Sequence, residues 1–487
     1  MSESVELGRI TTRVPARLDR LPWSHFHWLV VFGLGTVWIL DGLEVTVVGA
    51  VSGVLSSGKS GVALTGSEVI LAGAIYVVGA CLGALFFGQP TDRFGRKKLF
   101  MITLGLYLLA TGLTALSWNP IWFFVMRFFT GAGIGGEYSA INSAIDELIP
   151  AKYRGRVDLT INGSYWIGAL AGAVGGYFAL TYLPAFFGWR ICFAFGVVLG
   201  LSVLLVRRNV PESPRWLFIH GKQDKADEIV SGIERDVEEE TGRSLTEPAD
   251  SITIRQRRSI GFGLIAKSVF TLYPKRSILG FSLFVGQAFL YNAIFFSYVI
   301  VLTTFFGVSN NVAPLYLVPF AIGNFLGPLL LGPLFDSVGR KVMITSTYIL
   351  SGVLLLITGQ LFVAGVLNAA TQTAAWCVIF FFASAGASSA YLTVSEVFPM
   401  ETRALCIGFF YAIGTAVGGI TGPLLFSKLV ASGNRYDLNT GYILGAALMI
   451  AAGIVAAFLA VKAERQTLEN IAKPLTAEDT PSEDEAA

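Results

Sequence analysis

Charged side chains, cysteine and histidine are scarce in this chain of 487 residues. Asp, Glu, Lys and Arg make up 14% of it, whereas soluble domains average about 25%. The four cysteines lie in apolar stretches without metal-ligand spacing, and the three histidines lie outside those stretches. Since we also find no nucleotide-binding loop and no nucleophile–base pair, we expect neither an enzyme nor a bound metal or cofactor.

Long apolar runs dominate instead. Hydrophobic residues make up 54% of the chain, and runs of about 20 such residues are long enough to cross a bilayer as helices. The sequence therefore predicts an all-α polytopic membrane protein with twelve transmembrane helices. The predicted spans are 28–51, 69–88, 99–118, 121–149, 157–182, 189–206, 277–304, 312–335, 342–363, 373–396, 404–430 and 440–461.

Two short motifs occur twice, about half the chain apart. Residues 88–98 (GQPTDRFGRKK) return as 332–341 (GPLFDSVGRK), and Glu147-Leu-Ile-Pro returns as Glu396-Val-Phe-Pro. Such repetition predicts two pseudo-symmetric six-helix bundles. The expected segments are an N-terminal cytosolic segment 1–27, bundles 28–206 and 277–461, a cytosolic linker with short helices 207–276, and a cytosolic acidic tail 462–487.

Basic residues predict the orientation. With both termini in the cytosol, all but five Lys and Arg fall on the inner side. The exceptions are Lys59, Arg190, Lys428 and Arg435 outside, and Arg127 within a span. No cleavable signal peptide is expected before the first span. We therefore expect a multi-pass plasma-membrane protein, or an inner-membrane protein in a bacterium.

The chain resembles the major facilitator superfamily through the Asp-Arg-Phe-Gly-Arg-Lys loop at 92–97 and its echo at 336–341. Further motifs resemble its sugar porters. They are Pro211–Leu217 (PESPRWL), Gly188-Trp-Arg, Gln287 with Asn292, and Thr467-Leu-Glu-Asn-Ile. The resemblance implies the major facilitator fold and transport by alternating access.

Other motifs depart from sugar porters. Asp41-Gly-Leu-Glu44 resembles proton symporters of aromatic acids and metabolites and also organic-ion carriers, and Gly135-Gly-Glu-Tyr138 is similar to phosphate symporters and synaptic-vesicle-type carriers. Tyr391 stands where sugar porters have tryptophan. Hexose specificity is therefore not implied.

Four ionisable residues within the predicted spans stand out as candidates: Asp41, Glu44, Arg127 and Glu137. Such residues are costly in the hydrocarbon and mark functional sites. Glu44 and Arg127 lie at similar depths, about 10 Å from the outer end, so they can meet. We expect the acids to carry a coupling proton with Arg127 as their partner, as the resemblance to sugar/proton symporters also implies. A purely structural ion pair is the alternative. Three roles are possible for Glu137. It can bind the proton at a second site, contact a cationic substrate, or form a hydrogen bond that serves helix packing.

Polar and aromatic residues of the central spans are candidates for substrate binding near the bilayer midplane. Amides both donate and accept hydrogen bonds, and aromatic faces stack on rings. The candidates are Asn162, Tyr165, Trp166, Gln287, Tyr291, Asn292, Asn324 and Tyr391. For the aromatic residues, helix packing is the alternative.

Charges at the inner helix ends occur at matching places in both halves. By resemblance, they form ion-pair clusters that close the cytosolic side. These latch candidates are Asp92, Arg96, Glu147, Arg154, Arg156, Asp336, Arg340, Glu396 and Arg403. Anchoring by positive charge alone would not explain the acids.

These patterns predict a secondary carrier in which the proton is the coupling ion. We expect an organic or aromatic acid as substrate, with a sugar or polyol second. A proton-independent facilitator, an organic-cation carrier and a non-transporting nutrient sensor are the alternatives. The expected partners are the small-molecule substrate and the lipid bilayer, without nucleic acid, and the expected state is a monomer.

Overall fold

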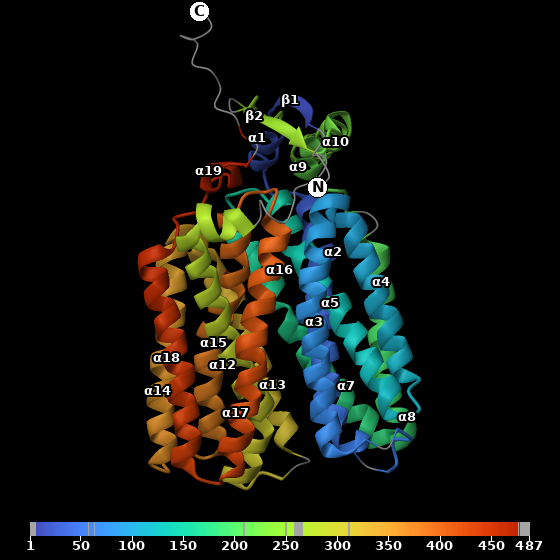
Figure 1. The fold of residues 1–487 in the computed structure, drawn as a ribbon, viewed down its shortest axis with the longest axis vertical. Coiled ribbons are helices and arrows are strands. Elements are labelled where there is room, and N and C mark those ends of the chain that lie inside the picture. The colour runs from blue at the N-terminus through green and yellow to red at the C-terminus, as the bar shows by residue number, and fades with distance from the viewer. Residues whose placement is uncertain are drawn as a thin grey trace, which may run out of the picture.

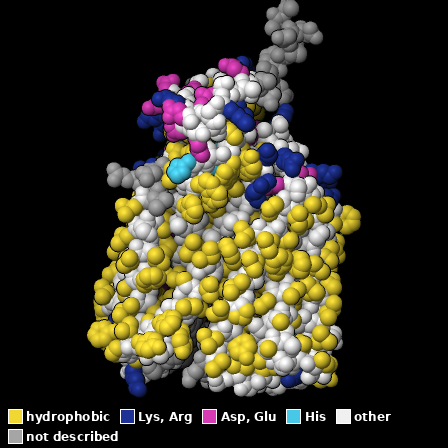
Figure 2. Space-filling model, turned by 180° about the vertical axis from the view of Figure 1, so that it is seen from behind, with side chains coloured by type: hydrophobic (Ala, Val, Ile, Leu, Met, Phe, Trp, Pro, Cys, Tyr) yellow, Lys and Arg dark blue, Asp and Glu magenta, His cyan; other side chains and the backbone are white. Residues whose placement is uncertain are grey.

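The computed structural model describes residues 6–56, 58–62, 64–207, 210–248, 251–257, 266–309, 312–475 and 477. Long helices run side by side in a bundle, and shorter elements form a cap on one end of it (Figure 1). Hydrophobic side chains cover the visible sides of the bundle, whereas most visible charged side chains gather on and near the cap (Figure 2). This distribution is typical of a bundle that stands in a bilayer.

The first half of the bundle contains seven helices. They are α2 (His25–Leu55), α3 (Gly66–Phe94), α4 (Arg96–Ala115), α5 (Pro120–Leu148), α6 (Arg154–Gly163), α7 (Tyr165–Tyr182) and α8 (Ala185–Arg207). Their ends carry recognisable start signals. Thr65 and Glu68 form a capping box before α3, and the Asn119 side chain accepts a hydrogen bond from the Trp122 amide before α5.

The second half repeats this order. Its helices are α12 (Pro274–Phe306), α13 (Leu317–Ser337), α14 (Arg340–Val363), α15 (Ala369–Val397), α16 (Arg403–Gly414), α17 (Ile420–Ala431) and α18 (Arg435–Leu459). A single π-helical turn, η3 (Thr415–Gly419), joins α16 to α17, and a 3₁₀ turn, η2 (Ala313–Tyr316), precedes α13. The all-α class and the paired bundles are as predicted.

Within the described residues, ten helices are long and apolar enough to cross a membrane. The structure explains why the other two predicted spans do not meet this criterion of length and hydropathy. Helix α5 carries four buried ionisable side chains, and the predicted span 157–182 divides at Ser164 into α6 and α7. A criterion based on hydropathy and unbroken helix length therefore does not count these two positions.

The cap is built from distant parts of the chain. Strand β1 (Glu6–Thr12) pairs antiparallel with β2 (Ile252–Arg257), and α1 (Val14–Asp19), α9 (Pro214–Ile219) and α10 (Gln223–Thr241) surround an apolar core with them. A π-turn, η1 (Ser268–Leu272), ends the linker before α12. Helix α19 (Leu468–Ile471) follows the last helix of the bundle. The sequence predicted the linker helices but not the sheet, because the strands lie about 240 residues apart.

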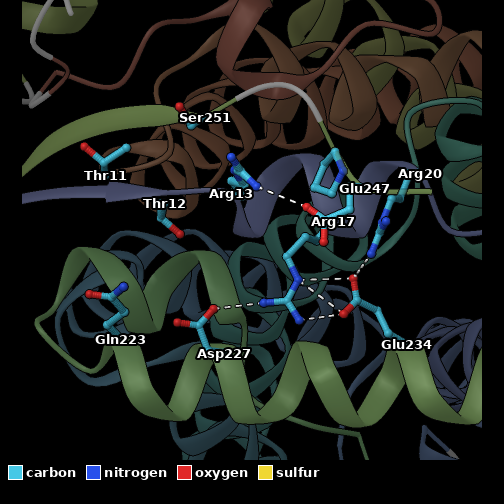
Figure 3. A pocket seen from close by; sticks show the side chains of 11 residues that line it. Thr11, Thr12, Arg13, Arg17, Arg20, Gln223, Asp227, Glu234, Glu247 and Ser251 are labelled. Carbon is cyan, nitrogen blue, oxygen red and sulfur yellow. Dashed lines mark hydrogen bonds and ion pairs between the residues drawn. The ribbon is translucent and has the colours of Figure 1, made fainter. Parts of the chain in front are cut away.

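A recess of about 530 Å³ opens between β1, α1 and α10 (Figure 3). Arg17 reaches across it to Asp227 at 3.0 Å and to Glu234, which Arg20 also contacts. The arginines of the recess already form ion pairs with its acids. These ion pairs attach the N-terminal segment to α10, so the recess is not a free anion-binding site.

The two halves meet chiefly near the cap. Helix α3 packs on α16 and η3, and α13 packs on α6, whereas α17 packs on α12 and α18 of its own half. The contacts between the halves thus involve the cap-proximal part of the divided helix α16–α17 (Figure 1).

Candidate functional site

Glu44 and Arg127 meet inside the first half of the bundle. The guanidinium of Arg127 on α5 donates a hydrogen bond to Glu44 on α2, and each residue is 1% exposed. The guanidinium carbon of Arg127 also lies 4.5 Å from the ring centroid of Tyr76 on α3. An ionised pair with an aromatic face beside it can persist in a low-dielectric interior. The geometry therefore supplies the contact that proton coupling requires, while the role of each residue stays a prediction.

Asp41 occupies a different environment, although it lies only one turn from Glu44. Its two carboxylate oxygens accept hydrogen bonds from the hydroxyls of Tyr76, at 2.7 Å, and Tyr138. It forms no ion pair within the described chain. Two neutral hydroxyl donors thus hold the Asp41 carboxylate, whereas a charged guanidinium holds Glu44.

Glu137 has no hydrogen-bond partner for either carboxylate oxygen among the described residues, and it is 1% exposed. The two glycines before it let α5 approach its neighbours, because a Cβ at Gly135 would lie 1.9 Å from the Ala80 carbonyl oxygen. An ionised carboxylate without donors is strongly disfavoured at such a place. This conformation therefore suits the protonated form of Glu137.

Aromatic side chains from both halves meet beside these acids. Trp38 stacks on Tyr138 with ring centroids 4.6 Å apart and meets Tyr391 edge-on at 5.3 Å. Tyr411 lies 4.7 Å from Tyr138, and Phe284 lies 4.9 Å from Tyr391. We call these five residues the aromatic cluster. Only Tyr391 among them was a sequence candidate.

A second group of rings gathers around Trp166 of the first half. Its ring centroid lies 5.8 Å from Tyr291, 5.8 Å from Phe295 and 5.5 Å from Phe320 of the second half. The other candidates Tyr165 and Asn324 adjoin this group, since Tyr165 packs on Trp166 and Tyr291 donates a hydrogen bond to Asn324.

The candidate amides differ in how many of their hydrogen-bonding groups remain available for a ligand. The amide nitrogens of Asn292 and Asn324 donate to carbonyls of their own helices, and that of Asn162 donates to Asn142 and the Asp158 carbonyl. Gln287 is buried and makes no hydrogen bond to any described residue. It lies one turn from both Phe284 and Tyr291 on α12, between the two aromatic groups. Gln287 is therefore the amide best placed to bind a ligand.

At the cap end, the predicted latch residues form reciprocal contacts between the halves. Glu147 on α5 accepts hydrogen bonds from Arg96 at 2.9 Å and from Arg403 of the other half at 3.3 Å. In mirror fashion, Arg340 holds Glu396 through two hydrogen bonds of 3.0 Å, and Arg154 of the first half lies 3.6 Å from Glu396.

Asp92 and Asp336 each pair with an arginine and reach into the opposite half. Asp92 lies 3.2 Å from Arg96 and accepts a hydrogen bond from the Leu405 amide in the first turn of α16. Asp336 lies 3.0 Å from Arg340 and accepts from the Gly155 and Arg156 amides in the first turn of α6, and from the Arg156 side chain at 3.2 Å. A carboxylate at a helix N-terminus is favourable, so each contact ties the bundles together.

Comparison with known proteins agrees with this arrangement. The family model described as "Sugar (and other) transporter" matches residues 44–474. This chain is a member of the sugar (and other) transporter family. The transporter is 26% identical over 457 residues to the niacin transporter NiaP of Acinetobacter baylyi, covering 94% of this chain and 99% of that protein. It is also 26% identical to the 4-hydroxybenzoate transporter PcaK of the same species, covering 90% and 92%.

Among solved structures, the transporter resembles the proton:xylose symporter XylE of the major facilitator superfamily, bound to 6-bromo-6-deoxy-D-glucose. The TM-score is 0.76 at 19% identity, covering 92% of this chain and 98% of that one. The predicted major facilitator fold and superfamily are thereby confirmed, and the relatives are transporters rather than enzymes.

Several residues of the transporter's site were not predicted from the sequence. Trp38 precedes Asp41 by one helical turn, and Tyr138 follows Glu137 directly, so proximity to the intramembrane acids was a usable signal for both. Asp146 and Asp158 also lie within predicted spans and were overlooked because they border the charged loop. No such signal marks Tyr411, which reaches the cluster only through the packing of α16.

The cap is tied to the latch by further ion pairs that the sequence did not indicate. Arg215 on α9 donates to Glu469 at 2.9 Å and to the Glu147 carbonyl at 2.5 Å, and it lies 3.2 Å from Asp19 on α1. Burial raises the pKa of Glu469, but the charge and the hydrogen bond of Arg215, together with a backbone hydrogen bond and the charge of Arg403, hold the pKa below its ordinary value. Asp19 also lies 3.5 Å from Arg154, so the N-terminal segment contacts the latch directly.

Proposed function

We propose that this transporter is a proton symporter for a small aromatic acid, working by alternating access between its two bundles. Tyr138 carries the argument, because it belongs to both candidate sites at once. Its ring stacks on Trp38 in the aromatic cluster, and its hydroxyl donates to Asp41. A substrate that displaces or reorients this ring therefore changes the hydrogen bonding of a buried acid.

The aromatic cluster suits a planar ring with a polar substituent. Trp38, Tyr391 and Phe284 supply faces and edges for a ring, and aromatic pairs of this kind contribute about 0.5–1.5 kcal/mol each. The indole nitrogen of Trp38 has no acceptor among the described residues, and the Gln287 amide is similarly free. Both can donate to a carboxylate or hydroxyl. The names of the relatives NiaP and PcaK, niacin and 4-hydroxybenzoate transporters, point to the same class.

We further propose that the cap faces the cytosol of a plasma membrane. Basic and acidic side chains gather at this end in Figure 2, and a short, charged loop at the same end joins α3 to α4 through Gly95, which has a positive φ. The latch contacts then correspond to a carrier closed toward the cytosol, with the proton as coupling ion entering from outside.

The test is proton movement in proteoliposomes that contain the purified transporter and an internal pH dye. Adding nicotinate or 4-hydroxybenzoate outside should acidify the interior faster than in protein-free vesicles, which report passive diffusion of the acids. Xylose and a quaternary amine serve as class controls. Uptake of a labelled aromatic acid without acidification would make the carrier a facilitator. If only xylose acidifies the interior, the substrate is a sugar rather than an aromatic acid. If only the quaternary amine is taken up, the substrate is an organic cation.

A further inference from the structure

Asp146 on α5 and Asp158 on α6 are buried acids at the latch that no ion pair accounts for. Each residue is 0% exposed. One oxygen of Asp146 accepts a hydrogen bond from the Ser395 hydroxyl of the other half. Its second oxygen and both oxygens of Asp158 have no hydrogen-bond donor within the described chain. Burying these groups in the ionised form is therefore unfavourable.

Helix register brings the two carboxylates opposite one another. The Asn162 side chain of α6 donates a hydrogen bond to the Asn142 side chain of α5 at 3.2 Å. Asp146 follows Asn142 by one turn, and Asp158 precedes Asn162 by one turn. Because a short loop joins α5 to α6 and the helices run in opposite directions, one turn along each leads to facing positions.

The surrounding charges are engaged elsewhere. Those nearest the pair from the packed elements are Arg154 of α6, Arg340 of α14, Arg403 of α16 and Glu396 of α15. Arg340 and Arg154 contact Glu396, and Arg403 contacts Glu147. The arginines offset part of the repulsion without forming a hydrogen bond to either aspartate. Two facing carboxylates in such a place favour holding one proton between them.

We propose that Asp146 and Asp158 form a second proton-binding site, which holds one proton while the latch is closed and releases it to the cytosol when the latch opens. Opening withdraws the Ser395 hydroxyl from Asp146 and admits water. Both carboxylates then ionise, and the proton leaves to cytosolic water. The site rests on the proposed symport for its direction, and it makes the opening of the latch depend on cytosolic pH.

The test measures latch opening directly. Spin labels at exposed Lys152 and Ser337, introduced as K152C and S337C with the native cysteines replaced by alanine, lie on opposite halves beside the latch. Pulsed electron–electron double resonance in nanodiscs measures the distribution of distances between the two labels. The short and long distances then give the closed and open populations between pH 5.5 and 8.5. The open-to-closed ratio should rise with pH by up to about tenfold per pH unit, the limit for one released proton.

The variants D158N and D146N each remove one acid of the pair, so both should flatten this dependence by one proton. E239Q, which changes an exposed acid of α10, should keep the wild-type slope. If both aspartate variants keep the wild-type slope, the proposal is wrong. An open population that responds to Na⁺ at constant pH and loses this response in D158N would replace it by a metal-cation site. The readout needs no substrate, so failure of the proposed symport does not affect it.

Discussion

Three buried acids on α2 and α5 lie within a few turns of one another but differ in their partners. Glu44 has a guanidinium, Asp41 has two tyrosine hydroxyls, and Glu137 has no donor among the described residues. The partner decides how readily each acid takes up a proton, because a cation favours the ionised form and an empty environment favours the neutral one.

Removing the cation should make the acids easier to protonate. In R127A we expect the pH dependence of transport to shift upward, because Glu44 loses the charge that holds it ionised. E44Q should lose uphill accumulation but retain substrate exchange, which needs no net proton movement. Uptake of labelled 4-hydroxybenzoate into proteoliposomes, with and without a pH gradient, measures both. An unchanged pH profile in R127A would leave the pair with a structural role alone.

Gln287 and Asn292 form a matched pair for testing substrate contact. Q287A should weaken binding a few-fold to about tenfold, because a hydrogen bond to a ligand contributes about 0.5–1.5 kcal/mol. N292A should have a smaller effect, since its amide donates to the Ala288 carbonyl at 2.7 Å. Thermal-shift titration with nicotinate and 4-hydroxybenzoate measures the dissociation constants of the two variants. Equal affinities for Q287A and wild type would move the ligand away from α12.

At the scale of helices, glycine decides how closely the carrier elements approach. A Cβ at Gly42, between the two acids of α2, would lie 1.8 Å from the Tyr165 carbonyl oxygen of α7. The backbone there cannot give way without separating α2 from α7. Gly73 of α3 has nothing within 4 Å of its Cβ position and offers a matched control.

We expect G42A to destabilise the transporter by a few kcal/mol and to lower its thermal unfolding temperature, because the clash is with backbone rather than with a flexible side chain. G73A should be neutral or stabilise by up to about 1 kcal/mol through helix propensity. Thermal unfolding in detergent, followed by intrinsic fluorescence, compares the two. If G42A unfolds at the wild-type temperature, α2 and α7 do not cross this closely.

The latch joins elements rather than single residues, so its disruption should change the balance of conformations. E147Q removes the negative charge that Arg96 and Arg403 share. Because breaking one buried partner leaves charges unpaired, we expect the cytosol-open population to rise at least tenfold. The spin-label pair at positions 152 and 337 measures this change. Populations equal to those of wild type and E239Q would show that these ion pairs do not hold the halves together.

On the scale of the whole molecule, the cap connects the N-terminal segment, the linker and the bundle. His220 at the end of α9 stacks on Trp216 with centroids 4.3 Å apart, and Trp216 donates a hydrogen bond to the Asp92 carbonyl of α3. Burial lowers the pKa of His220 to about 4 from an ordinary 6.5. The imidazole of His220 is therefore neutral at neutral pH.

Acid should loosen the cap before it unfolds the bundle. The folded-state pKa of His220 is depressed, so its contribution is fully present above pH 6.5 and is lost as pH falls toward 4, by about 3 kcal/mol at most. Hydrogen exchange of the α9 amides, corrected for intrinsic rates, measures the local stability. H220Q should flatten this dependence. Equal acid sensitivity in H220Q and wild type would assign the loss to other groups.

The sequence by itself determined the membrane architecture and the two halves, because long apolar runs and repeated loop motifs are local properties of the chain. It also indicated which charges lie at the helix ends beside the cap, and it has glycine at positions 95 and 339, where the short loops require a positive φ. Depth along a helix was sufficient to bring Glu44 opposite Arg127. These are consequences of length, composition and position along one axis.

Only the tertiary structure decided the lateral contacts. It pairs Asp41 with tyrosines rather than with Arg127, and it assembles the aromatic cluster from both halves. It also brings Asn142 of α5 against Asn162 of α6 and joins β1 to a strand about 240 residues away. Such contacts depend on the rotation and crossing of helices that are remote in the chain. Apolar side chains of similar size specify these angles only through packing against one another, so no single stretch of sequence contains them.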